Sequence, residues 1–335
     1  MRIAEGAMRF GPVPLADALG AVLAHSVSVS DRRIRKGRIL DETDLADLAA
    51  SGYAEVIVAQ PAPDDLLEDA AAKLLGTALN ASEGLTLSDP FTGRVNVTAS
   101  CSGVARIGAS AILAANQVNP MITVATVPDL HQVDAGDMVA TIKVISFAVP
   151  EADVLRAAEL LEGSLSVSAV ELRQAELIVT EIPGGAGEKG VPAIKARLER
   201  LGVELIAVRT VAHEVGALAD SLAESRSELV LILTGSATSD PQDVAPSAVR
   251  QAGGEVARFG MPVDPGNLLF IGSIGPRHVI GLPGCARSPA LNGADWVLSR
   301  VACGINVGAE DIAAMGVGGL LKEIPTRPQP RRRKT

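Results

Sequence analysis

The stretch LVLILTGSATSDPQDVAP, residues 229–246, decides the fold of the C-terminal half of this sequence. It opens with an unbroken apolar run, 229–233, the pattern of a strand that is buried on both faces of a parallel sheet. Small and polar residues follow, and they lead into a helical pattern. Ligands of open α/β sheets bind beside the carboxyl ends of the strands. We therefore expect residues 234–243 to form a binding loop.

Strand-like and helix-like segments alternate on both sides of this stretch. Besides 229–233, we expect strands at 177–180 and 203–208, helices at 194–201, 215–222 and 246–252, and a last helix from about 287 to 301. Residues 268–271 and 278–281 are expected to pair as a hairpin or to add to the sheet. Regular alternation at this spacing is typical of parallel sheets with helical crossovers. The sequence predicts an α/β fold with a doubly wound, mostly parallel sheet in the C-terminal domain.

A smaller α+β region is expected before residue 150. Its predicted helices cover 15–24, a segment from the candidate cap Asp41 to 50, a segment ending at 79, and 109–117. Its predicted strands cover 54–59, 94–99, 121–127 and part of 133–144. The predicted organisation is a segment 1–60, an α+β domain 61–150, an α/β domain 151–305, and an extension with a basic tail, 306–335. We interpret the run Arg331 to Lys334 as a solvated terminus.

Composition excludes several classes of function. The 335 residues carry a formal charge of −9, which argues against a nucleic-acid surface. Hydrophobic residues make up 47% but aromatic residues only 2%, so small aliphatic side chains must fill the cores. Three cysteines and four histidines at irregular spacings predict neither structural zinc nor a disulfide framework. Without a signal peptide or an apolar run of membrane-spanning length, we expect a cytoplasmic protein with no membrane contact.

The loop 234–246 carries a family resemblance. Its Thr-Gly, followed by Pro-x-Asp-Val-x-Pro, resembles the signature loop of the molybdopterin-binding domain of molybdopterin adenylyltransferases and molybdenumtransferases. The resemblance implies that Asp243 is catalytic and orients a Mg²⁺ ion or a nucleotide phosphate, while the backbone of Thr234, Gly235 and Ser236 lines the pterin. From the residues alone, Asp243 is equally well a helix cap. Asp240 is best interpreted as a solvated turn residue.

A second motif, GLPGCARSP, covers residues 281–289. It follows a predicted strand and opens the predicted helix, where free backbone N–H groups attract anions. Gly-Leu-Pro-Gly with a serine four residues further on resembles the molybdenumtransferase motif, although Cys285 stands where asparagine is usual. The resemblance implies that these positions hold the pterin phosphate: Gly281, Pro283, Gly284, Arg287 and Ser288. The alternative is an ordinary glycine-rich turn.

Three other places depart from the family pattern. Residues 260–267 resemble a molybdenumtransferase segment whose two lysines would favour molybdate, but Asp264 and Asn267 replace them here. In the loop 180–190, Glu188 stands where the family carries aspartate. From the residues alone, Glu188 is equally well a first-turn residue whose charge is stabilised by the helix dipole. His213 and Glu214 stand where relatives carry acidic residues, and we interpret Glu214 as a helix-start residue.

The amino-terminal segment 1–60 contains stretches, among them 17–24, that resemble linker elements of molybdenumtransferases. The carboxyl-terminal β-barrel of those enzymes has no counterpart after the last predicted helix. The whole chain looks closest to molybdopterin-binding proteins, some of which continue into a cytidylyltransferase module; such a module would begin where this chain stops, at Thr335.

The leading hypothesis is a protein of molybdenum cofactor biosynthesis that binds molybdopterin or its adenylylated form. As an enzyme it would transfer an adenylyl group or molybdenum to the dithiolene, with Mg²⁺ as cofactor. The alternative is a non-catalytic carrier of the cofactor for a molybdenum hydroxylase, which the missing lysines favour. A pyrophosphatase ranks last. The expected partners are the pterin, a nucleotide, a molybdenum enzyme or cytidylyltransferase, and further copies of this chain, because the short amino-terminal elements would leave apolar surface exposed.

Overall fold

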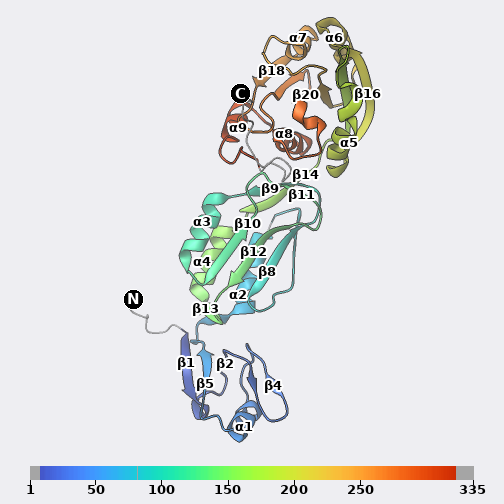
Figure 1. Cartoon of the computed structure of the whole chain (residues 1–335). Helices are drawn as coiled ribbons and strands as arrows, with labels where there is room; N and C mark the ends of the chain where they lie inside the picture. The colour runs from blue at the N-terminus through green and yellow to red at the C-terminus, as the bar shows by residue number, and fades with distance from the viewer. Residues whose placement is uncertain (1–7, 81, 322–335) are drawn as a thin grey trace, which may run out of the picture. The chain divides into compact units, whose positions relative to one another are not determined.

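The computed structural model describes residues 8–80 and 82–321 (Figure 1). Two compact units form: Met1–Cys101 with Ala105–Val167, and Ser102–Val104 with Ser168–Thr335. The predicted four-part division stays a prediction, and the basic tail lies outside the described residues. Residues 151–167, grouped by sequence with the C-terminal domain, pack in the amino-terminal unit. Among the described residues, no helix is both long and apolar enough to cross a membrane.

Residues 9–60 form a small sheet with helix α1 beside it. Strands β1 (Arg9–Pro14), β5 (Glu55–Gln60) and β2 (Val22–Leu23) pair antiparallel in the order β1-β5-β2. Helix α1 (Glu42–Ala50) begins at Asp41, as predicted, with a capping box between Asp41 and Asp44. The predicted helix 15–24 is wrong. A 3-10 turn, η1 (Leu15–Asp17), ends before Gly20, whose φ of +76° is incompatible with a helix, and β2 pairs with β5 instead.

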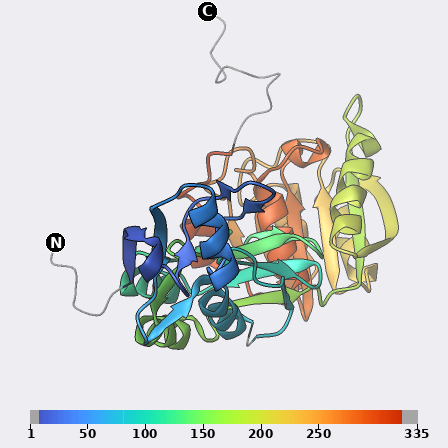
Figure 2. The same ribbon diagram turned by 90° about the horizontal axis from the view of Figure 1, so that it is seen from below.

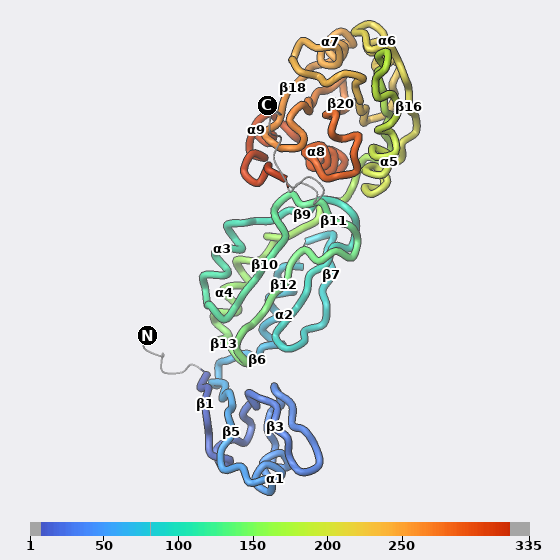
Figure 3. Tube along the Cα trace, in the orientation of Figure 1, coloured from blue at the N-terminus to red at the C-terminus, as the bar shows by residue number. Residues whose placement is uncertain are grey.

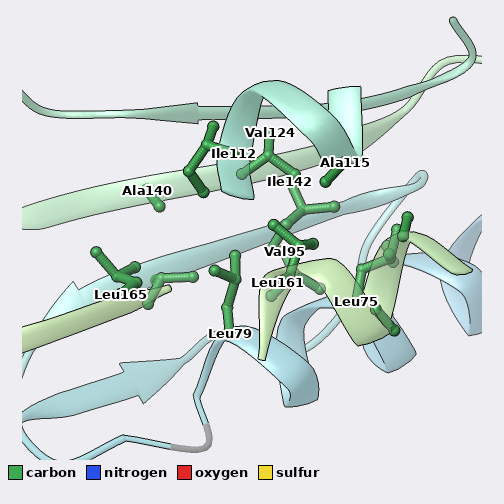
Figure 4. Packing of buried hydrophobic residues seen from close by; sticks show 14 of the residues in the cluster. Leu75, Leu79, Val95, Ile112, Ala115, Val124, Ala140, Ile142, Leu161 and Leu165 are labelled. Atoms are coloured by element: carbon green, nitrogen blue, oxygen red, sulfur yellow. The ribbon is translucent and has the colours of Figure 1, made fainter. Parts of the chain in front are cut away.

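The rest of the amino-terminal unit is an antiparallel sheet packed against helices. Strands β10 (Ile122–Thr126), β12 (Met138–Val144), β8 (Arg94–Ala99) and β7 (Leu85–Leu87) lie in that order, and α2 (Glu68–Leu79), α3 (Ala109–Val118) and α4 (Glu151–Leu161) pack on the sheet. Figure 4 shows Leu75, Leu79 and Leu161 from the helices against Val95 and Ile142 from the strands. The short strands are β3 (Val27–Ser28), β4 (Arg33–Ile34), β6 (Asp65–Leu67), β9 (Gly103–Ile107), β11 (Gln132–Val133), β13 (Ala148–Pro150) and β14 (Leu165–Ala169).

The C-terminal unit is an α/β structure around a six-stranded sheet in the order β16-β15-β17-β20-β19-β18 (Figures 1 and 2). The strands are β15 (Gln174–Glu181), β16 (Glu204–Ala212), β17 (Leu229–Leu233), β18 (Glu255–Phe259), β19 (Phe270–Ile274) and β20 (Arg277–Leu282). The first four in spatial order run parallel, and β19 and β18 are antiparallel to their neighbours. This confirms the predicted α/β class and the mostly parallel sheet.

Helices cover this sheet. Helices α6 (Val215–Glu224) and α7 (Val244–Gln251) share a core with the strands, where Leu218 and Val249 pack with Ile232. Figure 1 shows α5 (Val191–Arg200) and α8 (Gly293–Ala302) below the sheet and α6 and α7 above it; α9 (Ala309–Ala314) follows α8. Gly281 has a packing role, because a Cβ there would lie 1.9 Å from the Phe270 ring.

The last predicted helix starts later than expected. The chain leaves β20 into a 3-10 turn, η3 (Gly284–Arg287), and reaches α8 only at Gly293 (Figure 3). Pro289 has no N–H to donate, and Asn292 caps α8 in a capping box with Asp295. The motif 281–289 therefore does not open the long helix. The N–H groups of Ala294 and Asp295 are directed to the Asn292 side chain, and the motif residues Gly284–Arg287 lie on the 3-10 turn before this helix.

The parallel strands set the position of the site. Glu181 lies opposite Ala212, and Leu233 lies opposite both Val179 and Leu282. Parallel strands in register end at one edge of their sheet. The connections that follow them therefore leave from the same edge, which we call the carboxyl edge: residues 182–190, 213–214, 234–243 and 283–292. The sequence-based expectation that the loops 180–190, 234–243 and 281–288 share an edge is confirmed.

Candidate functional site at the carboxyl edge

Arg287 connects three of these loops. It lies on η3, half-buried, and donates from Nη1 to the carbonyl of Gly187 (2.7 Å) and from Nη2 to the carbonyl of Thr234 (2.9 Å). No carboxylate among the described residues forms an ion pair with it. Burial lowers the pKa of Arg287, because the charge loses hydration that no counter-charge replaces. Three of its five N–H donors make no hydrogen bond to the described residues.

Two glycines allow the loops to approach each other. At Gly190, a Cβ would lie 2.7 Å from Cγ of Arg287 and 2.8 Å from Cδ2 of Leu233. At Gly235, a Cβ would lie 2.7 Å from the carbonyl oxygen of Thr180. The loops after β15, β17 and β20 are thus packed to backbone contact, which gives the site a defined shape.

This close packing predicts the effect of Gly235→Ala. The added methyl group meets backbone rather than a flexible side chain, so overpacking should cost about 1–3 kcal/mol. We expect the thermal unfolding midpoint of this unit to fall by about 2–10 °C. Gly284→Ala is the matched control, because a Cβ at Gly284 meets nothing within 4 Å. Equal midpoints for the two variants would contradict the observed contact.

A second set of hydrogen bonds joins the strand ends at Gly235, the residue after the Thr234 carbonyl that Arg287 contacts. Thr180, at the end of β15, is fully buried, and its Oγ1 accepts a hydrogen bond from the backbone N–H of Gly235 (2.9 Å). The same oxygen lies 2.8 Å from Nδ1 of His213. The backbone N–H of His213 donates to the carbonyl of Glu181. The Thr180 hydroxyl therefore joins the ends of β15, β16 and β17.

The loop 234–243 is closed on itself. Thr234 donates from Oγ1 to the carbonyl of Ser236 (2.6 Å), and Ser236 is exposed. Asp243 caps α7: its Oδ1 accepts from the N–H of Val244 (2.7 Å) and its Oδ2 from that of Ser239 (3.0 Å). Asp240 accepts from the N–H of Gln242 (2.7 Å), as expected for a turn residue. The cap interpretation of Asp243 is therefore correct, and each carboxylate oxygen keeps a lone pair for a ligand.

The other predicted site residues lie at the same edge but are less closely connected. Glu188, on η2 (Gly187–Gly190), is exposed and accepts from Oγ1 of Thr210 (2.9 Å). Ser288 and Gly284 are exposed, and Pro283 is buried before η3. Gly281 belongs to the sheet core, as described above, so we remove it from the set of ligand contacts.

Sequence reasoning missed Arg197, a buried residue of α5. Its Nε donates to Asp295 (2.7 Å), and its two terminal nitrogens donate to the carbonyls of Ala286 (2.9 Å), Ser288 (2.8 Å) and Ala290 (2.9 Å). Arg197 thereby holds the loop that carries Arg287. Its only sequence signal is a charge beside Leu198 on the predicted apolar stripe of α5.

No cluster of three or more His, Cys, Asp or Glu side chains in residues 8–80 and 82–321 is placed to hold a metal ion. A groove of about 790 Å³ lies on α2 and α4, in the other unit, and is lined by Leu74, Leu155 and neighbours. The carboxyl edge instead offers a half-buried cation, Arg287, that has no ion pair among the described residues, together with several backbone and side-chain donors.

A comparison with known protein families points to the same part of the chain, the sheet and its carboxyl-edge loops. Residues 172–300 match the model of a family described as "Probable molybdopterin binding domain". This chain carries a molybdopterin-binding domain. The domain covers the whole parallel sheet with its carboxyl-edge loops, and its family belongs to molybdenum cofactor biosynthesis, in agreement with the resemblance of the two loop motifs. Residues 12–60 match a family described as "Domain of unknown function (DUF8806)".

Two solved structures have some similarity to the chain. One, a molybdopterin biosynthesis MoeA protein from Pyrococcus horikosii, has 12% identity and a TM-score of 0.31, with 89% of this chain and 75% of that chain covered. The other, a molybdopterin biosynthesis protein from Mycobacterium abscessus, has 14% identity and a TM-score of 0.29, with 40% and 94% covered. TM-scores this low do not establish a common overall fold. No curated protein matches the sequence.

Proposed function

We propose that the C-terminal unit, as a doubly wound sheet, binds molybdopterin or its adenylylated form at the carboxyl edge, with the pterin phosphate on Arg287. The observation that carries this proposal is the half-buried guanidinium without a carboxylate partner among the described residues, where three loops meet. A phosphate would replace the hydration that burial removes, and charged hydrogen bonds of this kind are the strong ones. The family match to residues 172–300 supports the pterin as the ligand.

The neighbouring groups have compatible roles in this proposal. Gly284 and Ser288 lie on either side of Arg287 and are exposed, so they can contact the same phosphate. The backbone of Thr234–Ser236 would line the pterin, because Arg287 already contacts the Thr234 carbonyl. Glu188 lies at the rim and would contact the outer part of the ligand. In this proposal, the amino-terminal unit is an α+β domain, as the sequence predicts.

Asp243 is the proposed catalytic residue. Mg²⁺ is commonly held by one or two carboxylates together with substrate phosphates, and the Asp243 carboxylate fits this donor chemistry. Its cap geometry holds the carboxylate in place, so it can orient a nucleotide phosphate. When bound, Mg²⁺ would supply charge neutralisation at that phosphate. The reaction would transfer an adenylyl group from a nucleotide, or molybdenum, to the dithiolene.

The alternative is a carrier that holds the cofactor without turnover. Asp264 and Asn267 stand in a loop between β18 and β19, and both are exposed. A carboxylate at position 264 repels an oxyanion such as molybdate, which weakens the case for metal insertion. Partners would be a molybdenum enzyme or cytidylyltransferase, and further copies of this chain, in a cytoplasmic setting.

Turnover assays of the purified chain separate the two functions. With molybdopterin, ATP and Mg²⁺, an adenylyltransferase releases pyrophosphate; with adenylylated molybdopterin and molybdate, a molybdenumtransferase releases AMP. We expect one of the two products, and we expect Asp243→Asn to lose it while still binding the pterin. Binding with neither product would establish the carrier, and no binding would reject the proposal.

A further inference from the structure

His213 contributes a second contact to the carboxyl edge. Its backbone lies directly after β16, and its ring is half-buried. Nδ1 lies 2.8 Å from Oγ1 of Thr180, while Nε2 has no hydrogen-bond partner among the described residues and is not one of their buried unpartnered atoms. One ring nitrogen is therefore held in the protein, and the other is open to a ligand.

The Thr180 hydroxyl determines which nitrogen carries the proton. Oγ1 already accepts from the N–H of Gly235, so its own hydrogen needs an acceptor, and a buried hydroxyl without one is costly. Among the described residues, the acceptor available to this hydrogen is Nδ1 of His213. Nδ1 must then be unprotonated, which places the ring proton on Nε2. A cationic imidazole would leave the Thr180 hydrogen without an acceptor.

We propose that His213 is a specificity-determining residue that presents a neutral Nε2–H donor to the pterin end of the ligand. This inference rests on the proposed function. Arg287 reaches the loops after β15 and β17, whereas His213 lies beyond β15, at the end of the edge strand β16. Neighbouring strands are about 4.8 Å apart, so His213 leaves the sheet at least one strand spacing away from the loops that Arg287 contacts. That separation suits opposite ends of a phosphorylated pterin rather than two contacts to one phosphate, and a neutral donor suits a pterin carbonyl oxygen or ring nitrogen.

The tautomer can be tested without any ligand. In ¹⁵N-histidine-labelled full-length protein, two-bond nitrogen–proton correlations should show His213 as the Nε2–H form. Thr180→Val removes the hydroxyl and should release this preference, while Thr180→Ser should retain it. A His213 ring that carries its proton on Nδ1, or that averages between forms in the unmodified protein, would overturn the inference.

Ligand contact is tested by comparing two probes on the same variants: molybdopterin, released anaerobically from a molybdenum enzyme, and inorganic phosphate as its competitor. His213→Ala should weaken molybdopterin binding by about 3- to 10-fold, the effect of one neutral hydrogen bond. It should leave phosphate competition unchanged, and His213→Gln should restore part of the affinity. Arg287→Ala should weaken both probes. His131→Ala, in the amino-terminal unit, is the control.

The outcomes separate the two proposals. Normal molybdopterin affinity in His213→Ala, with a loss in Arg287→Ala, overturns the role of His213 and leaves the proposed function standing. An equal loss of both probes in His213→Ala places the contact on the phosphate and overturns the pterin-end assignment. Molybdopterin binding that is insensitive to Arg287→Ala rejects the proposed phosphate site itself.

Discussion

Arg287→Ala is expected to weaken molybdopterin binding by about 10- to 100-fold, the range for a hydrogen-bonded charge pair. The guanidinium is half-buried and has no carboxylate partner among the described residues, so its loss removes the only charge that η3 offers to a phosphate. Anaerobic equilibrium titration followed by pterin absorbance measures the change.

Two variants separate charge from loop structure in this test. Arg287→Lys keeps the charge but cannot donate to the carbonyls of Gly187 and Thr234 at once, so we expect an intermediate affinity. Arg156→Ala removes an exposed guanidinium paired with Glu159 in the other unit and should bind normally. If Arg287→Ala and Arg156→Ala bind equally well, the phosphate does not lie on Arg287.

Glu176→Ala is expected to lower the free energy of unfolding of the C-terminal unit by about 3–5 kcal/mol. Glu176 is 3% exposed, and its carboxylate accepts from Oγ of Ser225 (2.6 Å), from two backbone N–H groups, at Arg226 and Ser227, and from Arg209 (2.6 Å). Removing it leaves the Arg209 charge and these donors without their acceptor. Urea denaturation measures the loss, and Glu199→Ala on the exposed face of α5 should change stability little.

The stabilisation by Glu176 should also depend on pH. Burial alone would raise the pKa of Glu176, but the hydrogen bonds from Ser225, Arg226 and Ser227, with the charge of Arg209, hold it below the ordinary value of 4.5. A carboxyl with a lowered pKa contributes its full stability above the unfolded value and loses it as the pH falls through the folded value. The difference between the unmodified protein and Glu176→Gln should therefore be constant above about pH 5 and shrink in more acidic solution. A constant difference down to pH 3 would contradict this.

Local signals explain how much of the fold could be predicted. The strand at 229–233 has the predicted bounds, because five consecutive apolar residues followed by a small, polar loop are typical of a strand buried on both faces. Helix α1 has its predicted cap, because Asp41 and Asp44 satisfy the first N–H groups locally. The helix predicted at 15–24 fails because pairing of Val22–Leu23 with β5 depends on residues more than thirty positions away.

The site was only partly predictable for the same reason. Loop motifs located Arg287, Asp243 and Gly235, since each lies in a short pattern. The contacts that shape the site join residues 33 to 100 positions apart, as between Thr180 and His213 or between Arg287 and Gly187. Pairs of that kind leave no periodic pattern in one sequence. They appear only when the parallel strands bring their ends to one edge.

The most direct measurement is ³¹P NMR of molybdopterin added under anaerobic conditions to the full-length protein and to Arg287→Ala. A phosphate bound by Arg287 at the carboxyl edge should show a shifted and broadened resonance with the unmodified protein. The resonance should be close to that of free ligand with the variant at the same concentration. The same resonance with both proteins, bound or free, would contradict the placement of the phosphate on the loops that follow β15, β17 and β20.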